Sequence, residues 1–165
     1  MQRIQIISAM SENRVIGIQN HLPWQLPDDW ANFRKVTAGK AFMMGRKSYE
    51  AEDALLSDYR NVIISRQPDL QLPPHCQHAE SIEAAMDLLA DESEFFILGG
   101  AAIFRQTLPL ANYLHRTLVH AQVVGDAFFP EVDWSQWTLV RSEEHTADER
   151  HAYAFSIEEW QRNTH

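Results

Sequence analysis

The stretch EFFILGGAAIFRQTL, residues 94–108, contains the pattern that decides the fold. An apolar run of strand length ends at two glycines, 99–100, and a helical pattern over 101–108 begins directly after them. AFMMGRKSYE, residues 41–50, has the same order, with a strand that ends at Gly45 and a helix that follows it. A strand that leads into a helix at its carboxyl end is typical of a parallel α/β sheet.

Strand and helix patterns alternate through the rest of the chain. Strands are expected over 4–9, 41–44, 61–65, 94–98, 113–123, 137–145 and 151–158, and helices over 27–37, 46–51, 81–90 and 101–108. Ser81 is the expected N-cap of the third helix, and Pro27 suits the first turn of the first. No helix separates the last two strands. We therefore expect a largely parallel sheet, covered on both faces, with an antiparallel hairpin at one edge.

The composition favours a single cytoplasmic domain that spans residues 1–165, since the chain has no internal repeat and no linker. A net charge of −9 argues against nucleic acid as a partner, because phosphate binding needs clustered Lys and Arg. No run is long and apolar enough to span a bilayer, so no membrane partner is expected. The single cysteine, Cys76, cannot form an intrachain disulfide and fits a reducing compartment.

The segment HLPWQLPDD, residues 21–29, points to a carboxylate with a function. Two prolines bracket a tryptophan and restrict the loop, and the first helix begins at the second proline. Asp29 and Phe33 are four residues apart and share a helix face, whereas Asp28 points elsewhere. Acids also suit the first turn of any helix for electrostatic reasons. The apolar face that Asp29 shares favours a site over that alternative.

Three strand ends are candidate anion sites: 45–48, 65–66 and 99–100. Free amide groups and the helix dipole attract anions at a helix N-terminus, and glycines allow close approach of a ligand. An ordinary strand–helix turn with solvated cations is an equal alternative for 45–48 alone, and a lone Gly-Gly pair is a weak signal. The three together suit a dinucleotide, and an arginine at 66 suits a 2′-phosphate. Residues 75–78 contain His and Cys side chains that could bind a metal, but no second pair of such residues stands at the spacing of a zinc site. We therefore expect a loop there and no metal site.

Five motifs follow one another along nearly the whole chain: NRVIG (13–17), LPWQLPDD (22–29), MGRKS (44–48), LGGA (98–101) and GDAFFP (125–130). This set resembles the dihydrofolate reductase family, in its bacterial type. The resemblance implies an eight-stranded, mostly parallel sheet with an antiparallel C-terminal edge, four flanking helices and bound NADPH. It also implies a monomer that antifolate inhibitors bind.

The resemblance implies NADPH-dependent reduction of 7,8-dihydrofolate to 5,6,7,8-tetrahydrofolate, which supports one-carbon metabolism. Hydride passes to pterin C6, and N5 receives a proton from solvent. Asp29 would bind the pterin N3 and 2-amino group, with a supporting hydrogen bond from Thr117. Trp24 would hold a water beside Asp29, and Leu22 would bring a mobile lid over the nicotinamide. Burial against aromatic rings should raise the pKa of Asp29.

The resemblance also implies the residues that line the two ligand sites. Those for the substrate are Ile7, Ser8, Asp29, Trp30, Phe33, Arg34, Leu56, Arg60, Leu98, Phe104 and Thr117. Those for the cofactor are Ala9, Val15, Ile16, Gly17, Asn20, Leu22, Gly45, Arg46, Lys47, Ser48, Ser65, Arg66, Gly99, Gly100, Ala101, Ala102, Ile103 and Phe104.

The stretch 50–61 departs from the family pattern. Glu52 stands where an apolar wall residue is expected, and Tyr59 stands where an arginine normally grips the folate glutamate. Arg60 is one residue later, and a shift of one residue in a strand turns a side chain to the opposite face. Either the loop brings Arg60 round, or Arg34 binds the tail, or folate binds weakly.

This departure leaves two rival functions. One is an NADPH-dependent reductase of another pterin or of a riboflavin-pathway pyrimidine, although such pyrimidine reductases are not expected to carry the Pro-Trp-x-Leu-Pro-x-Asp block. The other is a paralogue that binds nucleotide without catalysis, against which Asp29, Trp24 and Thr117 together argue.

Overall fold

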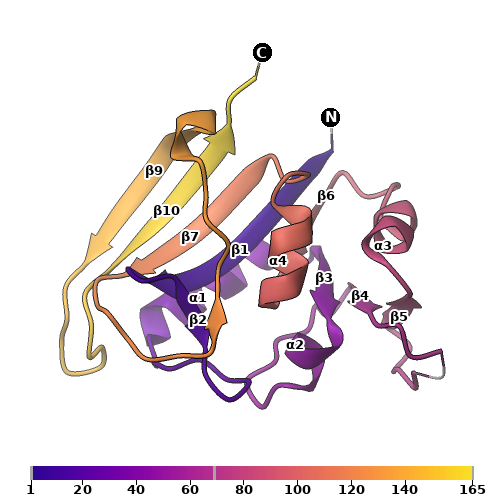
Figure 1. Ribbon diagram of the computed structural model, residues 1–165, viewed down its shortest axis with the longest axis horizontal. Helices are drawn as coiled ribbons and strands as arrows, with labels where there is room; N and C mark the ends of the chain where they lie inside the picture. Colours follow the sequence, from indigo (N-terminus) through magenta and orange to yellow (C-terminus); the bar gives the residue numbers. More distant parts are fainter. Residues whose placement is uncertain (1, 69, 165) are drawn as a thin grey trace.

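The centre of the fold is a sheet of eight strands in the spatial order β5-β4-β3-β6-β1-β7-β10-β9 (Figure 1). The computed structural model describes residues 2–68 and 70–164. The strands are β1 Arg3–Ser11, β3 Ala41–Gly45, β4 Arg60–Ile64, β5 Cys76–Ala79, β6 Glu94–Ile97, β7 Tyr113–Val119, β9 Trp137–His145 and β10 Phe155–Arg162. The pairs β7–β10 and β10–β9 are antiparallel, and the others are parallel. The expected mostly parallel sheet with an antiparallel C-terminal edge is confirmed.

Helices cover both faces of this sheet. They are α1 Pro27–Thr37, α2 Arg46–Glu50, α3 Ile82–Leu88 and α4 Ala101–Thr107, with one 3₁₀ turn, η1 Trp134–Gln136. Figure 1 shows α4 in front of the sheet and α1 behind it. Phe95 and Phe96 are both fully buried because successive side chains of β6 point to opposite faces. Phe95 packs in the cluster that contains α4, and Phe96 packs in the cluster that contains Phe33 of α1.

Local signals at two helix starts are confirmed by the structure. The Ser81 side chain accepts a hydrogen bond from the backbone N–H of Ala84 at 3.0 Å, which caps α3. Pro27 is the first residue of α1, where its missing N–H costs no helical hydrogen bond. Two short strands, β2 Val15–Gly17 and β8 Ala127–Phe128, form a separate antiparallel pair beside the main sheet.

Three strand predictions were wrong in extent or in kind. Residues 76–79, expected as a loop, form edge strand β5, which pairs in parallel with β4 through the register Asn61↔Cys76. The last strand begins at Phe155 rather than 151, because backbone hydrogen bonds between Asp148 and His151 close a tight turn there. The strand expected over 113–123 ends at Val119. Pairing with distant segments decided the first and third of these boundaries, and a local turn decided the second.

The parallel strands bring the segments after β3, β4 and β6 to one edge of the sheet. β3 lies between β4 and β6, with Met43 paired to both Val62 and Ile97. The N-termini of α2 and α4, which follow β3 and β6, therefore lie next to each other. Among the described residues, no helix is long and apolar enough to cross a membrane.

Candidate active site

A cavity of about 440 Å³ opens over the carboxyl ends of β1 and β6. Its wall includes Ile7 and Ala9 of β1, Leu98 after β6, and Asp29 and Phe33 of α1. Apolar side chains thus lie beside Asp29, and other parts of the wall carry charged residues such as Asp53, Arg116 and Asp126. Such a cavity suits a flat apolar ligand that presents hydrogen-bond donors at one end.

Asp29 lies in the first turn of α1 and is paired with a residue of the sheet. The Oγ1 of Thr117 donates a hydrogen bond to Asp29 Oδ1 at 2.5 Å. Burial raises the pKa of Asp29 above its ordinary value, while the Thr117 hydrogen bond and the charge of His145 act in the opposite direction. The expectation of a raised pKa is confirmed. A buried carboxylate of this kind favours a ligand that offers it N–H donors.

Asp28, one residue earlier, points away from the cavity, as expected. Its side chain is 44% exposed and lies 3.7 Å from Nη1 of Arg150. The two neighbouring aspartates therefore have different surroundings. Of the two, only Asp29 lies on the wall of this cavity.

The segment 18–26, which we call the lid, lies beside the mouth of the cavity. Trp24 and Leu26 anchor one end of the lid in an apolar cluster with Phe155. Nearer its middle, Asn20 Nδ2 donates to the carbonyl of Lys47 at 3.0 Å. The backbone N–H of Leu22 donates to Asp53 Oδ2 at 2.9 Å.

Asp53 was missed by sequence reasoning. It is an acid in a short loop after α2, and such a residue carries no local signal that links it to the lid. Its partner is a backbone amide 31 residues earlier, which only the folded chain brings within reach.

The backbones just before α2 and α4 are joined by a hydrogen bond. The N–H of Gly45 donates to the carbonyl of Gly99 at 2.7 Å. Gly99 has a φ of +107°, and a Cβ there would lie 2.9 Å from the ring of Phe104. A Cβ at Gly100 would lie 3.6 Å from the Ser48 Oγ. The cap residue of each helix is a glycine, which has no side chain to occupy the free amides.

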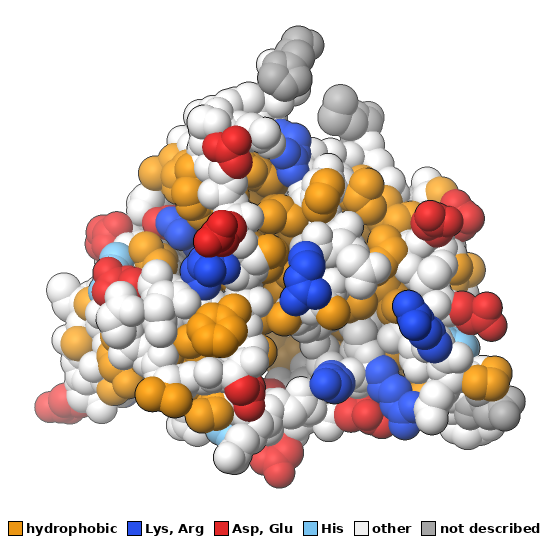
Figure 2. All heavy atoms as spheres, viewed as in Figure 1, with side chains coloured by type: hydrophobic (Ala, Val, Ile, Leu, Met, Phe, Trp, Pro, Cys, Tyr) orange, Lys and Arg blue, Asp and Glu red, His pale blue; other side chains and the backbone are white. Residues whose placement is uncertain are grey.

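Positive charge gathers near these helix starts although the chain as a whole carries a net charge of −9. Figure 2 shows the face over α2 and α4, where several Lys and Arg side chains surround a hollow in the surface. Arg46 and Lys47 are the first two residues of α2, and Arg46 also pairs with Glu50 at 3.1 Å. Free helix amides with nearby cations form a favourable place for phosphate groups.

Comparison with known proteins identifies the family of this chain. A family model described as dihydrofolate reductase matches residues 3–162. The chain belongs to the dihydrofolate reductase family. It is 38% identical over 154 residues to the dihydrofolate reductase of Bacillus subtilis, covering 93% of this chain and 91% of the relative. It is 41% identical over 157 residues to that of Neisseria meningitidis serogroup A, covering 94% and 96%.

A solved dihydrofolate reductase has nearly the same fold. The structure from Enterococcus faecalis, complexed with NADP(H) and a compound named RAB-propyl, superposes with a TM-score of 0.87. The two chains are 32% identical, and the match covers 98% of this chain and 97% of the other. The match extends over the whole sheet and its flanking helices.

Most residues that the dihydrofolate reductase resemblance implies lie on the cavity wall. They are Ile7, Ser8, Ala9, Ile16, Gly17, Asn20, Leu22, Asp29, Trp30, Phe33, Ser48, Leu98, Gly100, Ala101, Phe104 and Thr117. Those that the described wall does not include are Val15, Trp24, Arg34, Gly45, Arg46, Lys47, Leu56, Arg60, Ser65, Arg66, Gly99, Ala102 and Ile103. Most of the second group belong to the lid anchor, the helix starts or the end of β4.

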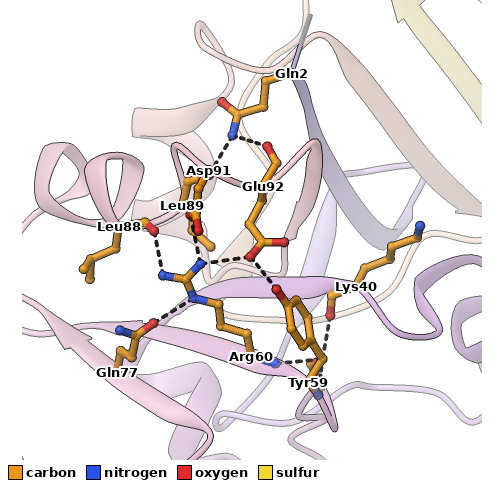
Figure 3. Close-up of polar contacts among 10 residues, drawn as sticks. Gln2, Lys40, Tyr59, Arg60, Gln77, Leu88, Leu89, Asp91 and Glu92 are labelled. Atoms are coloured by element: carbon orange, nitrogen blue, oxygen red, sulfur yellow. Dashed lines mark hydrogen bonds and ion pairs between the residues drawn. The ribbon is translucent and has the colours of Figure 1, made fainter.

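The contacts of Arg60 do not favour the alternative in which the loop brings this residue round to the folate tail. Figure 3 shows its guanidinium turned toward the segment after α3. Nη1 of Arg60 lies 2.9 Å from Glu92 Oε2 and 3.1 Å from Asp91 Oδ1, and Nη2 donates to the Leu88 carbonyl at 2.6 Å. These contacts tie β4 to the turn before β6. Arg60 is not among the described residues that line the substrate cavity.

Tyr59 does not take over the role of an arginine either. Its side chain is 53% exposed, and its hydroxyl donates to Glu92 Oε2 at 2.7 Å (Figure 3). Of the three alternatives, a tail contact from Arg34 and weak binding of folate remain. Arg34 lines a second pocket next to the main cavity, together with Trp30 and Asp53, which belong to both.

Proposed function

We propose that the protein reduces 7,8-dihydrofolate to 5,6,7,8-tetrahydrofolate with NADPH and so supports one-carbon metabolism. The observation that carries this proposal is the partly buried Asp29, paired with Thr117, in a cavity that reaches the starts of α2 and α4. Membership of the dihydrofolate reductase family supports it. The cavity joins a place for a heterocycle with N–H donors to a place for a dinucleotide.

The pterin is bound by Asp29 through its N3 and 2-amino groups, as two charge-assisted hydrogen bonds. Ile7, Leu98 and Phe33 line the cavity beside this carboxylate and hold the ring system in its plane. Thr117 restricts the Asp29 carboxylate to one orientation. Trp24 and Leu22 act from the lid, Trp24 by anchoring it and Leu22 by covering the reacting rings.

The residues at the helix starts fit NADPH. Gly99 lets the backbone pass close to the Phe104 ring, where a Cβ would clash, and the free amides of α2 and α4 suit the phosphates of NADPH. The pyrophosphate would be held by Ser48, Arg46 and Lys47. The 2′-phosphate would be held by Ser65 and Arg66, which follow β4. When bound, NADPH supplies the hydride that reduces pterin C6.

The chain itself contributes alignment and exclusion of water. The lid covers the reacting rings, and the apolar wall lowers the local dielectric around Asp29. Because the pKa of Asp29 is raised, this carboxyl group titrates closer to working pH than an exposed aspartate does. Asp29 polarises the pterin, and N5 takes its proton from solvent.

Arg34 binds the glutamate tail of the substrate. It lies on α1 one residue after Phe33, and the pocket that it lines is continuous with Trp30 on the wall of the main cavity. The other catalytic parts do not depend on this contact. A weak tail contact would therefore raise the KM for dihydrofolate more than it lowers kcat.

We place the protein in the cytoplasm as a single-domain monomer that antifolates inhibit at the substrate cavity. The lone Cys76, a free thiol, supports a reducing compartment. Light scattering coupled to size-exclusion chromatography tests the monomer, and competition against dihydrofolate tests antifolate binding.

One assay decides the function. Nicotinamide absorbance is followed with purified protein, NADPH and dihydrofolate, and then with a pterin that lacks the glutamate tail. Turnover of dihydrofolate with clear preference over the tail-less pterin supports the proposal. Equal turnover of both would instead favour a reductase of another pterin, and turnover of neither would favour a nucleotide-binding paralogue.

A further inference from the structure

Helix α1, which carries Asp29, has an apolar residue at its N-cap position. Leu26 is 1% exposed and packs with Trp24 and Phe155, so its side chain cannot accept a hydrogen bond from the helix. The first four N–H groups of a helix have no acceptor within the helix. Pro27 has no N–H, which makes the amide of Asp28 the first that needs a partner.

A histidine from the other end of the chain supplies this partner. The backbone N–H of Asp28 donates to Nε2 of His151 at 3.1 Å, across a sequence separation of 123 residues. His151 is only 2% exposed. A distant buried side chain therefore does what Ser81 does locally for α3.

The contacts of the ring determine its tautomer. Nε2 of His151 lies 3.8 Å from Oδ2 of Asp28, which is beyond hydrogen-bond distance, and 3.1 Å from the backbone N of the same residue. Because a backbone N–H can only donate, Nε2 presents its lone pair to it. The ring proton is then on Nδ1, which donates to Asp148 Oδ1 at 2.8 Å. This hydrogen bond, more than any other cause, lowers the pKa of Asp148 below its ordinary value. A carboxylate at Nδ1 thus favours the tautomer that the helix requires.

The ring is held in place by its turn and by the core. Residues 148–151 form a turn closed by backbone hydrogen bonds of 2.9 and 3.2 Å between Asp148 and His151. The ring of His151 also packs on Phe155, with 5.4 Å between centroids. Phe155 belongs to the same cluster as Trp24 and Leu26, so the cap and the lid anchor share one apolar support.

We propose that His151, as its Nδ1–H tautomer, supplies the acceptor that caps the N-terminus of α1 and is a positioning residue for Asp29. The capped amide belongs to the residue directly before Asp29, so the cap holds the turn from which the carboxylate reaches Thr117. Its effect on catalysis rests on the proposed function, whereas the cap itself does not. Loss of the acceptor leaves the Asp28 N–H unpaired, loosens the first turn and weakens the grip on the pterin.

The tautomer is tested without any assay of activity. Protein labelled with ¹⁵N at its histidines is examined by NMR, and the His151 signals are assigned from their loss in His151→Gln. The proposal expects a protonated Nδ1 and an unprotonated Nε2 in the native protein near neutral pH. A proton on Nε2 would overturn it, because Nε2 could then no longer accept from Asp28.

Two substitutions separate the cap from mere packing. Gln places its Oε1 near the position of Nε2 and keeps an acceptor, whereas Leu fills similar space without one. His151→Leu should speed hydrogen exchange of the Asp28 amide, because the helix loses its cap. It should also raise the KM for dihydrofolate on the order of tenfold, because Asp29 is held less firmly in position. His151→Gln should stay within about threefold of wild type in both measurements, and the KM for NADPH should change little in either variant. Equal defects in the two variants would overturn the proposal.

Arg150→Ala is the matched control. Arg150 lies in the same turn and approaches the Asp28 side chain rather than its amide, so its loss should leave Asp28 exchange and the dihydrofolate KM unchanged. If wild-type protein fails to reduce dihydrofolate, the proposed function fails. The tautomer and the Asp28 exchange rates still decide the cap in that event.

Discussion

Thr117 on β7 and Asp29 on α1 are joined by a hydrogen bond of 2.5 Å, although they are 88 residues apart in sequence. The hydroxyl is held by the sheet, since Thr117 pairs with Ala9 of β1 on one side and Ile157 of β10 on the other. The carboxylate is held by the first turn of a helix on one face of that sheet. This bond therefore couples the helix to the sheet at the point where the pterin is expected to bind.

Thr117→Val keeps the shape of the side chain and removes the donor. The pKa of Asp29 should rise further, because the hydrogen bond from Thr117 now lowers it. The limb of the pH profile of kcat/KM that reports Asp29 should move to higher pH, and kcat/KM at pH 7 should fall about tenfold. Thr117→Ser, which keeps the hydroxyl, is the control, and an unchanged profile in the valine variant would contradict the pairing.

Asp29→Asn removes the charge that binds the pterin. Turnover of dihydrofolate at neutral pH should fall by about 10²–10⁴-fold, the usual contribution of a positioned acid or base. The affinity for NADPH, measured by fluorescence titration, should stay nearly intact because the helix starts are unchanged. Full turnover in this variant would remove Asp29 from the mechanism.

The same substitution should stabilise the fold at neutral pH. Burial raises the pKa of Asp29 above its ordinary value of 3.8, so between these two values the folded state binds more protons than the unfolded state. Stability therefore falls as pH rises through this window. The free energy of unfolding of Asp29→Asn, from urea titration, should exceed that of wild type at pH 7, and the advantage should narrow as pH falls toward 3.8.

Asp28→Asn is the matched control for that measurement. Asp28 is exposed and adjacent, and its removal should give no gain in stability at pH 7. A gain in both variants would point to a general effect of charge in the helix rather than to burial of Asp29.

Asp53→Ala should release the lid. The Leu22 N–H loses a charged acceptor, and its hydrogen exchange should speed up by about tenfold or more. Exchange of the Ala84 amide, capped by Ser81 far from the lid, provides an internal reference. Equal protection of Leu22 in both proteins would show that the Asp53 contact does not restrain the lid in solution.

Arg60 and Arg34 should have opposite roles. Arg60→Ala removes four polar contacts of a partly buried guanidinium and should cost about 1–3 kcal/mol of stability. The same change should leave the KM for dihydrofolate unchanged. Arg34→Ala should raise that KM with little loss of stability, and it should not affect a pterin without the glutamate tail. A raised KM in Arg60→Ala alone would restore the tail role to Arg60.

The fold was largely predictable because its strongest signals are local. Apolar strand runs that end in glycine and continue as a helix, at 41–50 and 94–108, indicated a parallel sheet without any tertiary information. Edge strand β5 was missed because the segment is short and mixes polar with apolar residues. It becomes a strand only by pairing with β4. Strand β10 begins later than predicted because residue 151, its expected first residue, belongs to the turn 148–151.

The site divides in the same way. The chain order and chemistry of 22–29, 44–48 and 98–101 identified Asp29 and the helix starts, because these groups act from positions next to their own motif. The partners of Leu22, Asp28 and Arg60 could not be read from the chain, since each is a hydrogen-bond partner at least 17 residues away. Residue types and local periodicity therefore established the elements and the family, whereas long-range hydrogen bonds decided which side chains hold Asp29 and the lid in place. A hydrogen bond depends on distances of a few tenths of an ångström, and only the packed sheet and its helices determine those.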